Sequence, residues 1–135
     1  MAMKTILLLV HLLLALPAWA GWEELCENEE SVHYVDWTTL KADGQRRSVW
    51  GLIDMKTPVA GRGNSKRSLD EYDCKAARWR YLQSTDFSGQ MAGGNILINS
   101  SAPTPWQYVA PGTFGAMVLE TACTPKRPVA TPTKR

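Results

Sequence analysis

The sequence contains few of the side chains that perform chemistry. It has two histidines and three cysteines in 135 residues. His11 lies in an apolar N-terminal stretch, so His33 is the one histidine left for the rest of the chain. Neither a Cys-x-x-Cys nor a His-x-x-x-His spacing occurs, and metal sites normally need several such ligands at set spacings. The sequence therefore predicts no metal site, no cofactor and no catalytic residues.

Two weaker catalytic arrangements keep a small hydrolase open as an alternative. His33 could pair with Cys74 as a base and a nucleophile, and carboxylates such as Asp70, Glu71 and Asp73 can hydrolyse glycosides when two of them flank a bond. Cys74 has a better use in a disulfide, however, and acids on alternating faces of a strand are typical of a solvated surface. We therefore favour a protein that is not an enzyme.

Long apolar runs are also missing. The longest one, from Ile6 to Leu16, is interrupted by His11 and is far shorter than the ~20 residues that span a bilayer. Lys4 precedes this run, and Pro17 followed by Ala18-Trp19-Ala20 comes after it. A basic start, a short apolar stretch and a small-x-small site are typical of a secretory signal peptide. We expect residues 1–20 to be removed, leaving an exported chain without a transmembrane segment.

The formal charge of +2 conceals two oppositely charged parts. Residues 21–123 contain 10 Lys and Arg against 13 Asp and Glu, a net charge of 10 − 13 = −3. Residues 124–135 carry four basic groups and three prolines, a composition that predicts a disordered tail. An acidic body provides no basic surface for nucleic acid, so we expect no nucleic-acid partner.

The body of the chain shows the patterns of a small antiparallel sheet. Residues 32–37 and the apolar run at 48–54 favour two strands, and Asp43-Gly44 between them predicts a hairpin with a longer loop. Residues 66–82 are expected to be extended, because Trp79 and Tyr81 alternate with arginines; a helix over 71–83 is the competing interpretation. Residues 96–98 and 106–109 predict two further short strands.

One helix is predicted at the end of the body. Phe114, Met117, Val118, Thr121 and Ala122 follow a helical spacing, with Thr113 as its N-cap and an end near Cys123, before Pro125. The sequence thus predicts an α+β fold for residues 21–123, in which a small antiparallel sheet of about five to six strands packs with one C-terminal helix.

The three cysteines allow three possible pairs, and an exported chain reaches a compartment where disulfides persist. We favour Cys74–Cys123, because it would link the end of the helix to the sheet. By the chain-entropy estimate, closing a loop of this length adds about 4 kcal/mol to the free energy of unfolding. Cys26 would then be an unpaired thiol, either buried or paired between chains. The glutamates around it would raise its pKa and disfavour the reactive thiolate.

The remaining candidate for function is a basic and aromatic surface. Arginine and tryptophan are enriched at protein interfaces. If two or more tryptophans were exposed beside Lys66, Arg67, Arg78 and Arg80, they would form a surface for binding a ligand. The alternative is that the tryptophans pack in the core and the basic side chains are only solvated.

Several of these segments together resemble the surface-adhesin protein E family of Gram-negative bacteria. The matching residues are Tyr34-Val35-Asp36, Val49-Trp50, Ser68, Glu71-Tyr72-Asp73-Cys74, Arg80, Ser88-Gly89-x-Met91-x-Gly93, Trp106, Val109-x-Pro111-Gly112 and Cys123. The resemblance covers roughly Trp22 to Cys123. It implies a small antiparallel sheet with a C-terminal helix and a disulfide at the positions of Cys74 and Cys123.

The resemblance also implies a function, the binding of host extracellular-matrix or serum proteins. Typical adhesins of this kind are lipoproteins, whereas this chain lacks a lipidation cysteine after its leader. Two hypotheses follow. The first is an exported, adhesin-like binding module at the cell surface or in the periplasm. The second is a periplasmic structural or envelope-associated protein without a host ligand. The oligomeric state stays open, with a dimer as one possibility.

Overall fold

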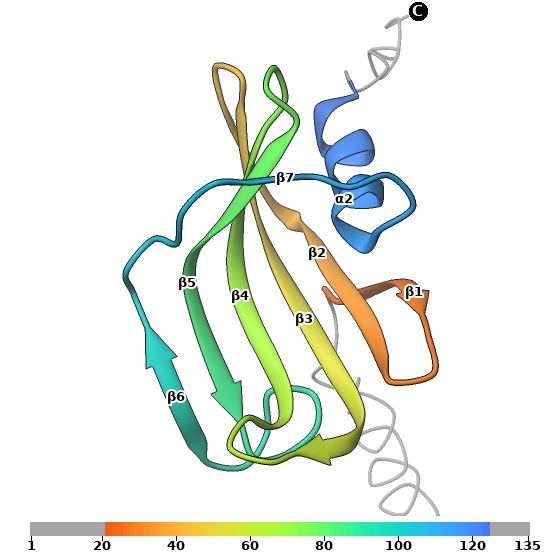
Figure 1. Cartoon of the computed structure of the whole chain (residues 1–135), viewed down its shortest axis with the longest axis vertical. Helices are drawn as coiled ribbons and strands as arrows, with labels where there is room; N and C mark the ends of the chain where they lie inside the picture. Colours follow the sequence, from red (N-terminus) through yellow and green to blue (C-terminus); the bar gives the residue numbers. More distant parts are fainter. Residues whose placement is uncertain (1–20, 125–135) are drawn as a thin grey trace, which may run out of the picture.

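Six strands follow one another in chain order across one antiparallel sheet, β1 to β6 (Figure 1). The structure, a computed structural model, describes residues 21–124. The predicted signal peptide and all but the first residue of the predicted tail lie outside the described residues. The strands are β1 Glu23–Glu27, β2 Ser31–Asp43, β3 Arg46–Val59, β4 Gly63–Asp73, β5 Arg78–Phe87 and β6 Ile96–Ser100. A short strand β7, Gln107–Tyr108, pairs with β5 off this path, and the helix α2, Phe114–Cys123, follows it.

The predicted α+β fold is confirmed, including the strand at 48–54 inside β3 and the helix at the end. Thr113 caps α2, because its hydroxyl oxygen accepts a hydrogen bond from the Ala116 amide at 3.3 Å. Val118 and Ala122 are buried, whereas Met117 and Thr121 of the predicted apolar stripe are exposed. The helix therefore buries a narrower face than its sequence pattern suggested.

Two local predictions about the sheet need correction. The β2–β3 hairpin has a connection of two residues, Gly44-Gln45, and not a longer loop, since Asp43 pairs directly with Arg46. Gly44 has φ +56°, and glycine at the first central position is the choice of a tight hairpin turn. Residues 66–82 do not form one extended segment, because a turn at 74–77 separates β4 from β5. The Asp73 carboxylate accepts hydrogen bonds from the Lys75 and Ala76 amides at 3.1 and 3.0 Å, which stabilises that turn.

The sheet has two faces, and α2 covers one of them. The core consists of Val35, Val49 and Tyr72 from the sheet with Val118 from the helix. We call this side the helix face; side chains alternate along each strand, so Trp50, Leu69 and Glu71 lie on the opposite face. Arg47 donates from Nε to the Ala122 carbonyl oxygen at 3.2 Å, which adds a polar contact between β3 and the end of the helix.

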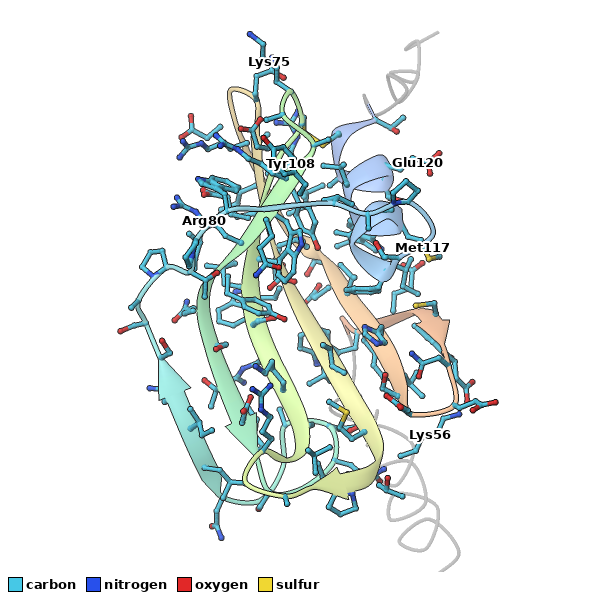
Figure 2. All side chains as sticks on the ribbon, viewed as in Figure 1. Lys56, Lys75, Arg80, Tyr108, Met117 and Glu120 are labelled. Carbon is cyan, nitrogen blue, oxygen red and sulfur yellow. A yellow bond between two sulfur atoms is a disulfide. The ribbon has the colours of Figure 1, made fainter. Side chains whose placement is uncertain are left out.

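The segment between β6 and α2, residues 101–113, crosses the sheet beside β5 and is called the crossing segment below (Figure 1). Backbone hydrogen bonds attach it to β5: the Thr104 amide donates to the Tyr81 carbonyl at 2.9 Å, and the Val109 amide donates to the Ala77 carbonyl at 3.0 Å. Figure 2 shows Arg80 near the place where this segment passes β5, and Met117 and Glu120 on the outer side of α2. Between residues 21 and 124, no helix has the length and apolar character that crossing a membrane requires.

Candidate functional site

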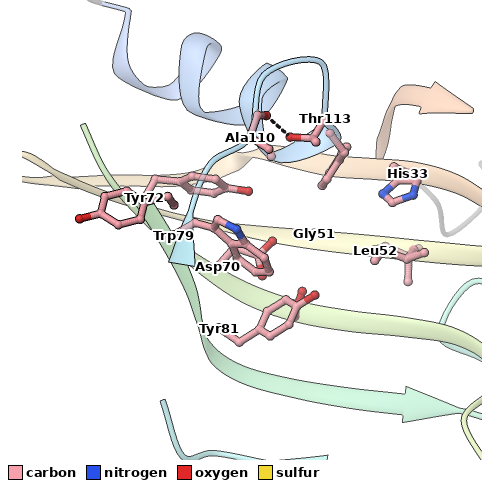
Figure 3. A pocket seen from close by; sticks show the side chains of 14 residues that line it. His33, Gly51, Leu52, Asp70, Tyr72, Trp79, Tyr81, Ala110 and Thr113 are labelled. Carbon is pink, nitrogen blue, oxygen red and sulfur yellow. Dashed lines mark hydrogen bonds between the residues drawn. The ribbon is translucent and has the colours of Figure 1, made fainter. Parts of the chain in front are cut away.

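A pocket of about 310 Å³ lies on the helix face of the sheet, beside the start of α2. The pocket lies between the strands β2 to β5 on one side and the crossing segment with the start of α2 on the other (Figure 3). Aromatic side chains dominate its wall, among them Tyr72, Trp79, Tyr81 and Phe114. The rings of Trp79 and Tyr81 meet edge to face, with centroids 4.8 Å apart and planes at 84°. The pocket is therefore concave and mostly apolar, as sites for small molecules generally are.

Asp70 is the acidic residue of this pocket, and it is buried with 6% of its surface exposed. It pairs across the sheet with Val49 on β3 and Tyr81 on β5, so the carboxyl group lies on the helix face among nonpolar neighbours. Burial raises the pKa of Asp70 to about 7, and the Ser68 hydroxyl and the Lys66 ammonium only partly offset that increase. Asp70 Oδ1 accepts no hydrogen bond from any residue between 21 and 124.

Gly51 makes room for this carboxyl group. A Cβ atom at Gly51 would lie 3.2 Å from Asp70 Oδ2, which is closer than most contacts of real Cβ atoms. A larger residue there would push the carboxyl group toward the open space of the pocket. The position of the Asp70 carboxyl group therefore depends on a glycine at position 51 of the neighbouring strand.

His33 lines the same pocket from β2. Its ring lies 4.4 Å from the ring of Phe114, and Nε2 is 2.9 Å from the Ser31 hydroxyl. Burial lowers the pKa of His33, so the imidazole is neutral at physiological pH. Within residues 21–124, no group of three or more His, Cys, Asp or Glu side chains is arranged to hold a metal ion.

The four basic residues predicted to form one binding surface are divided between two faces. Lys66 and Arg67 are adjacent on β4 and therefore point to opposite sides. Lys66 lies on the helix face, with Nζ 3.4 Å from Asp86 Oδ1. Arg67 lies on the opposite face, 5.7 Å from the ring of Trp50 and 5.1 Å from the ring of Phe87. These two residues do not share a surface with each other.

Arg78 and Arg80 do lie together, on the opposite face, and a tryptophan lies between them. Trp106 of the crossing segment contacts three guanidinium groups, with its ring 4.3 Å from Arg80, 4.7 Å from Arg78 and 5.5 Å from Arg46. Arg78 also bonds to Asp73 at 3.1 Å, and Arg80 bonds to Glu71 at 2.8 Å. Arg78 and Arg80 are therefore not simply solvated, as the alternative interpretation of the sequence had it. Together with Trp106 they attach the crossing segment to the sheet.

The acids at positions 70, 71 and 73 are likewise not a solvated face. Asp70 is buried on the helix face, whereas Glu71 and Asp73 have only 14% and 13% of their side chains exposed and bind arginines on the other face. Sequence reasoning singled out these acids and missed the burial of Asp70. No signal in the sequence marked this burial, because the pairing of Gly51 with Ser68 beside Asp70 depends on the register of β3 and β4.

The disulfide links Cys74 to Cys123, as we favoured from the sequence, and so fixes the end of α2 to the turn after β4. Cys26 forms no disulfide with the described residues and lies on β1 where the pairing with β2 shifts register. Burial, and next the charge of Glu24, raise the pKa of the Cys26 thiol. The Cys26 thiolate is therefore disfavoured.

The free edge of the sheet at β6 carries three consecutive exposed apolar side chains. Ile96, Leu97 and Ile98 are 61%, 47% and 47% exposed. Sequence reasoning predicted this strand but not its exposure. One signal could have found it: no charged residue occurs between Asp86 and Glu120.

Comparison with known proteins agrees with this architecture. The sequence pattern of the family described as "Surface-adhesin protein E" matches residues 19–124. Two solved structures of Haemophilus influenzae protein E are similar in fold. The selenomethionine form has a TM-score of 0.60 at 13% identity, covering 77% of this chain and 86% of that one. The protein from a non-typeable strain has a TM-score of 0.58 at 15% identity, covering 82% and 81%. No curated protein matches the sequence significantly.

Proposed function

The chain belongs to the surface-adhesin protein E family, and on this premise we propose that it is an exported envelope protein that binds host extracellular-matrix or serum proteins through β6. The single observation that supports this assignment most strongly is the exposed apolar edge formed by Ile96, Leu97 and Ile98. The proposal assigns the leader to export and residues 21–123 to the binding domain.

The edge of β6 has the properties of a protein-binding strand. On the side away from β5, its backbone amides and carbonyls have no neighbouring strand among the described residues. Soluble proteins usually protect such an edge with charged side chains, and this part of the chain has none between Asp86 and Glu120. An extended segment of a partner can therefore add to the sheet by backbone hydrogen bonds, while Ile96 and Ile98 contact its side chains.

We assign the contact to β6 in preference to the four basic residues. Lys66, Arg78 and Arg80 already have acidic partners within the chain. Charges that are paired in this way contribute little to a new interface. The Cys74–Cys123 disulfide supports export, because such bonds persist in oxidising compartments outside the cytoplasm.

A solid-phase binding assay on residues 21–135 tests the proposal, with immobilised vitronectin, laminin and plasminogen as probes. The native chain should bind at least one of them saturably. The affinity of the double variant Ile96→Lys/Ile98→Lys should be lower by a factor of about ten or more, because two charges at the edge oppose strand addition. Met117→Lys is the matched control, since Met117 is also an exposed apolar residue, 41% exposed, but lies on α2.

Circular dichroism should show the same fold for all three proteins. If the native chain binds and the β6 variant binds equally well, the contact lies elsewhere and the assignment to β6 is wrong. If the native chain binds none of the probes, the second hypothesis gains support, that of an envelope-associated protein without a host ligand.

A further inference from the structure

The pocket beside α2 contains a buried acid that has one carboxyl oxygen without a hydrogen-bond partner. Asp70 forms no ion pair with any residue between 21 and 124, and its Oδ1 atom accepts no hydrogen bond there. A buried carboxylate normally has a cation or several donors beside it, because removing it from water is costly. Asp70 instead faces an open space of about 310 Å³. The missing partner therefore has room to come from outside the chain.

The walls around this acid complement a positive charge. Figure 3 shows Asp70 with Trp79 and Tyr81 beside it, beneath the segment that carries Ala110 and Thr113. The Trp79 and Tyr81 rings stand at 84° to each other, 4.8 Å apart, so that they form two walls of a corner. Faces of Trp and Tyr attract cations, and ammonium groups are recognised by aromatic walls of this kind.

We propose that this pocket binds a small organic cation, whose ammonium group is held by Asp70 and the rings of Trp79 and Tyr81 and whose apolar part contacts Phe114. This site is separate from the β6 edge and does not depend on the proposed function. A volume of about 310 Å³ limits the ligand to roughly a dozen non-hydrogen atoms.

An anion or a neutral ligand fits the pocket less well. No lysine or arginine lines it. The Lys66 ammonium lies 5.3 Å from the Tyr81 ring but is bound to Asp86. At the start of α2, the Ala116 amide is already occupied, because it donates to Thr113 Oγ1. A neutral ligand would leave the Asp70 carboxylate unpaired in a low-dielectric site.

Binding should depend on pH in a direction that the site dictates. Burial raises the pKa of Asp70 to about 7, so the carboxylate that attracts a cation predominates above neutral pH. The titratable groups around it are Lys66 and Tyr72 on β4, Tyr81 on β5, Tyr108 on β7 and the neutral His33 on β2; α2 adds none to the pocket wall. Affinity for a permanent cation should therefore increase up to about tenfold from pH 6 to pH 8.

Isothermal titration of residues 21–135 at pH 8 with four probes tests the proposal. Tetramethylammonium and n-butylammonium should bind saturably, whereas n-butanol and n-butyrate should bind at least about tenfold more weakly. Asp70→Asn should remove most of the cation binding, and Tyr81→Leu should weaken it severalfold. Asp43→Asn is the matched control, because Asp43 is exposed at the β2–β3 turn and its loss should change nothing.

The opposite outcomes would overturn the proposal. Equal binding of n-butanol and n-butylammonium would show an apolar pocket without charge recognition. Full cation binding by Asp70→Asn, or no cation binding by the folded native chain, would also refute it. A peptide with one lysine is a further probe: if it alone binds, the ligand is a protein side chain and the small-molecule assignment is wrong. The Ile96→Lys/Ile98→Lys variant should bind n-butylammonium as the native chain does, which separates this test from that of the β6 edge.

Discussion

Cys74 and Cys123 join the turn after β4 to the last residue of α2 by a disulfide across a sequence separation of 49. The helix has few other attachments at this end, apart from the hydrogen bond between Arg47 and the Ala122 carbonyl. The disulfide therefore holds the helix over Val35, Val49 and Tyr72, the part of the core that Val118 completes.

Loss of this disulfide should destabilise the whole domain. The variant Cys74→Ser/Cys123→Ser should lose about 4 kcal/mol of unfolding free energy in urea, the value expected for a loop of this length. Hydrogen exchange should accelerate more in α2 than in β3. Cys26→Ser is the control and should leave stability nearly unchanged, because Cys26 is unpaired. Equal stability of the double variant and the native chain would contradict this role.

Asp70 should give the domain an unusual dependence of stability on pH. In the unfolded chain its carboxyl group titrates near the ordinary value of 3.8, whereas the folded protein keeps the proton until about pH 7. Between these values the unfolded state has fewer protons bound, so this group lowers stability as the pH rises. The stabilising contribution of the Asp70 proton is fully present below pH 4 and is lost above pH 7.

The variant Asp70→Asn should therefore match the native stability at pH 4 and exceed it at pH 8 by up to about 4 kcal/mol. Urea titrations of both proteins across this range measure the difference, in which the contributions of other groups cancel. A constant difference at all pH values would show that the Asp70 proton is not retained on folding.

Trp106 should stabilise the crossing segment through its three arginines. Trp106→Ala should cost roughly 2 kcal/mol of unfolding free energy, because it removes cation–π contacts with Arg46, Arg78 and Arg80. Tyr108→Ala is the neighbouring control and should cost less than about 0.5 kcal/mol, since Tyr108 is 83% exposed. A similar cost for both variants would mean that the arginines do not hold this segment.

Two glycines with the same backbone angle should respond differently to alanine. Gly61 and Gly63 both have φ +75°, but a Cβ at Gly61 meets nothing within 4 Å, whereas one at Gly63 would overlap the Phe87 carbonyl oxygen. Gly61→Ala should cost about 1 kcal/mol, for the left-handed backbone alone. Gly63→Ala should cost at least about 3 kcal/mol, because β4 or β5 must move. Thermal denaturation of the two variants distinguishes these values.

Local patterns in the sequence were enough for most of the fold. The helix follows from the spacing of Phe114 and Val118 with a threonine cap, and β3 follows from its apolar run. The pairing of Cys74 with Cys123 could be favoured because it would link the end of the predicted helix to a predicted strand of the sheet. These features depend on neighbours along the chain, which a sequence displays directly.

The tertiary structure alone decided what the candidate sites are. In the sequence Asp70 resembled its neighbours Glu71 and Asp73, and only the register with Val49 and Tyr81 placed it in the pocket on the helix face. Lys66 and Arg67 seemed to form one surface, yet the alternation of a strand puts them on opposite faces. The exposure of β6 depends on its place at the end of the strand order. Burial and pairing are set by segments far apart in the chain, and for that reason no local pattern revealed them; for β6, the uncharged stretch between Asp86 and Glu120 was the one local sign of an unprotected edge.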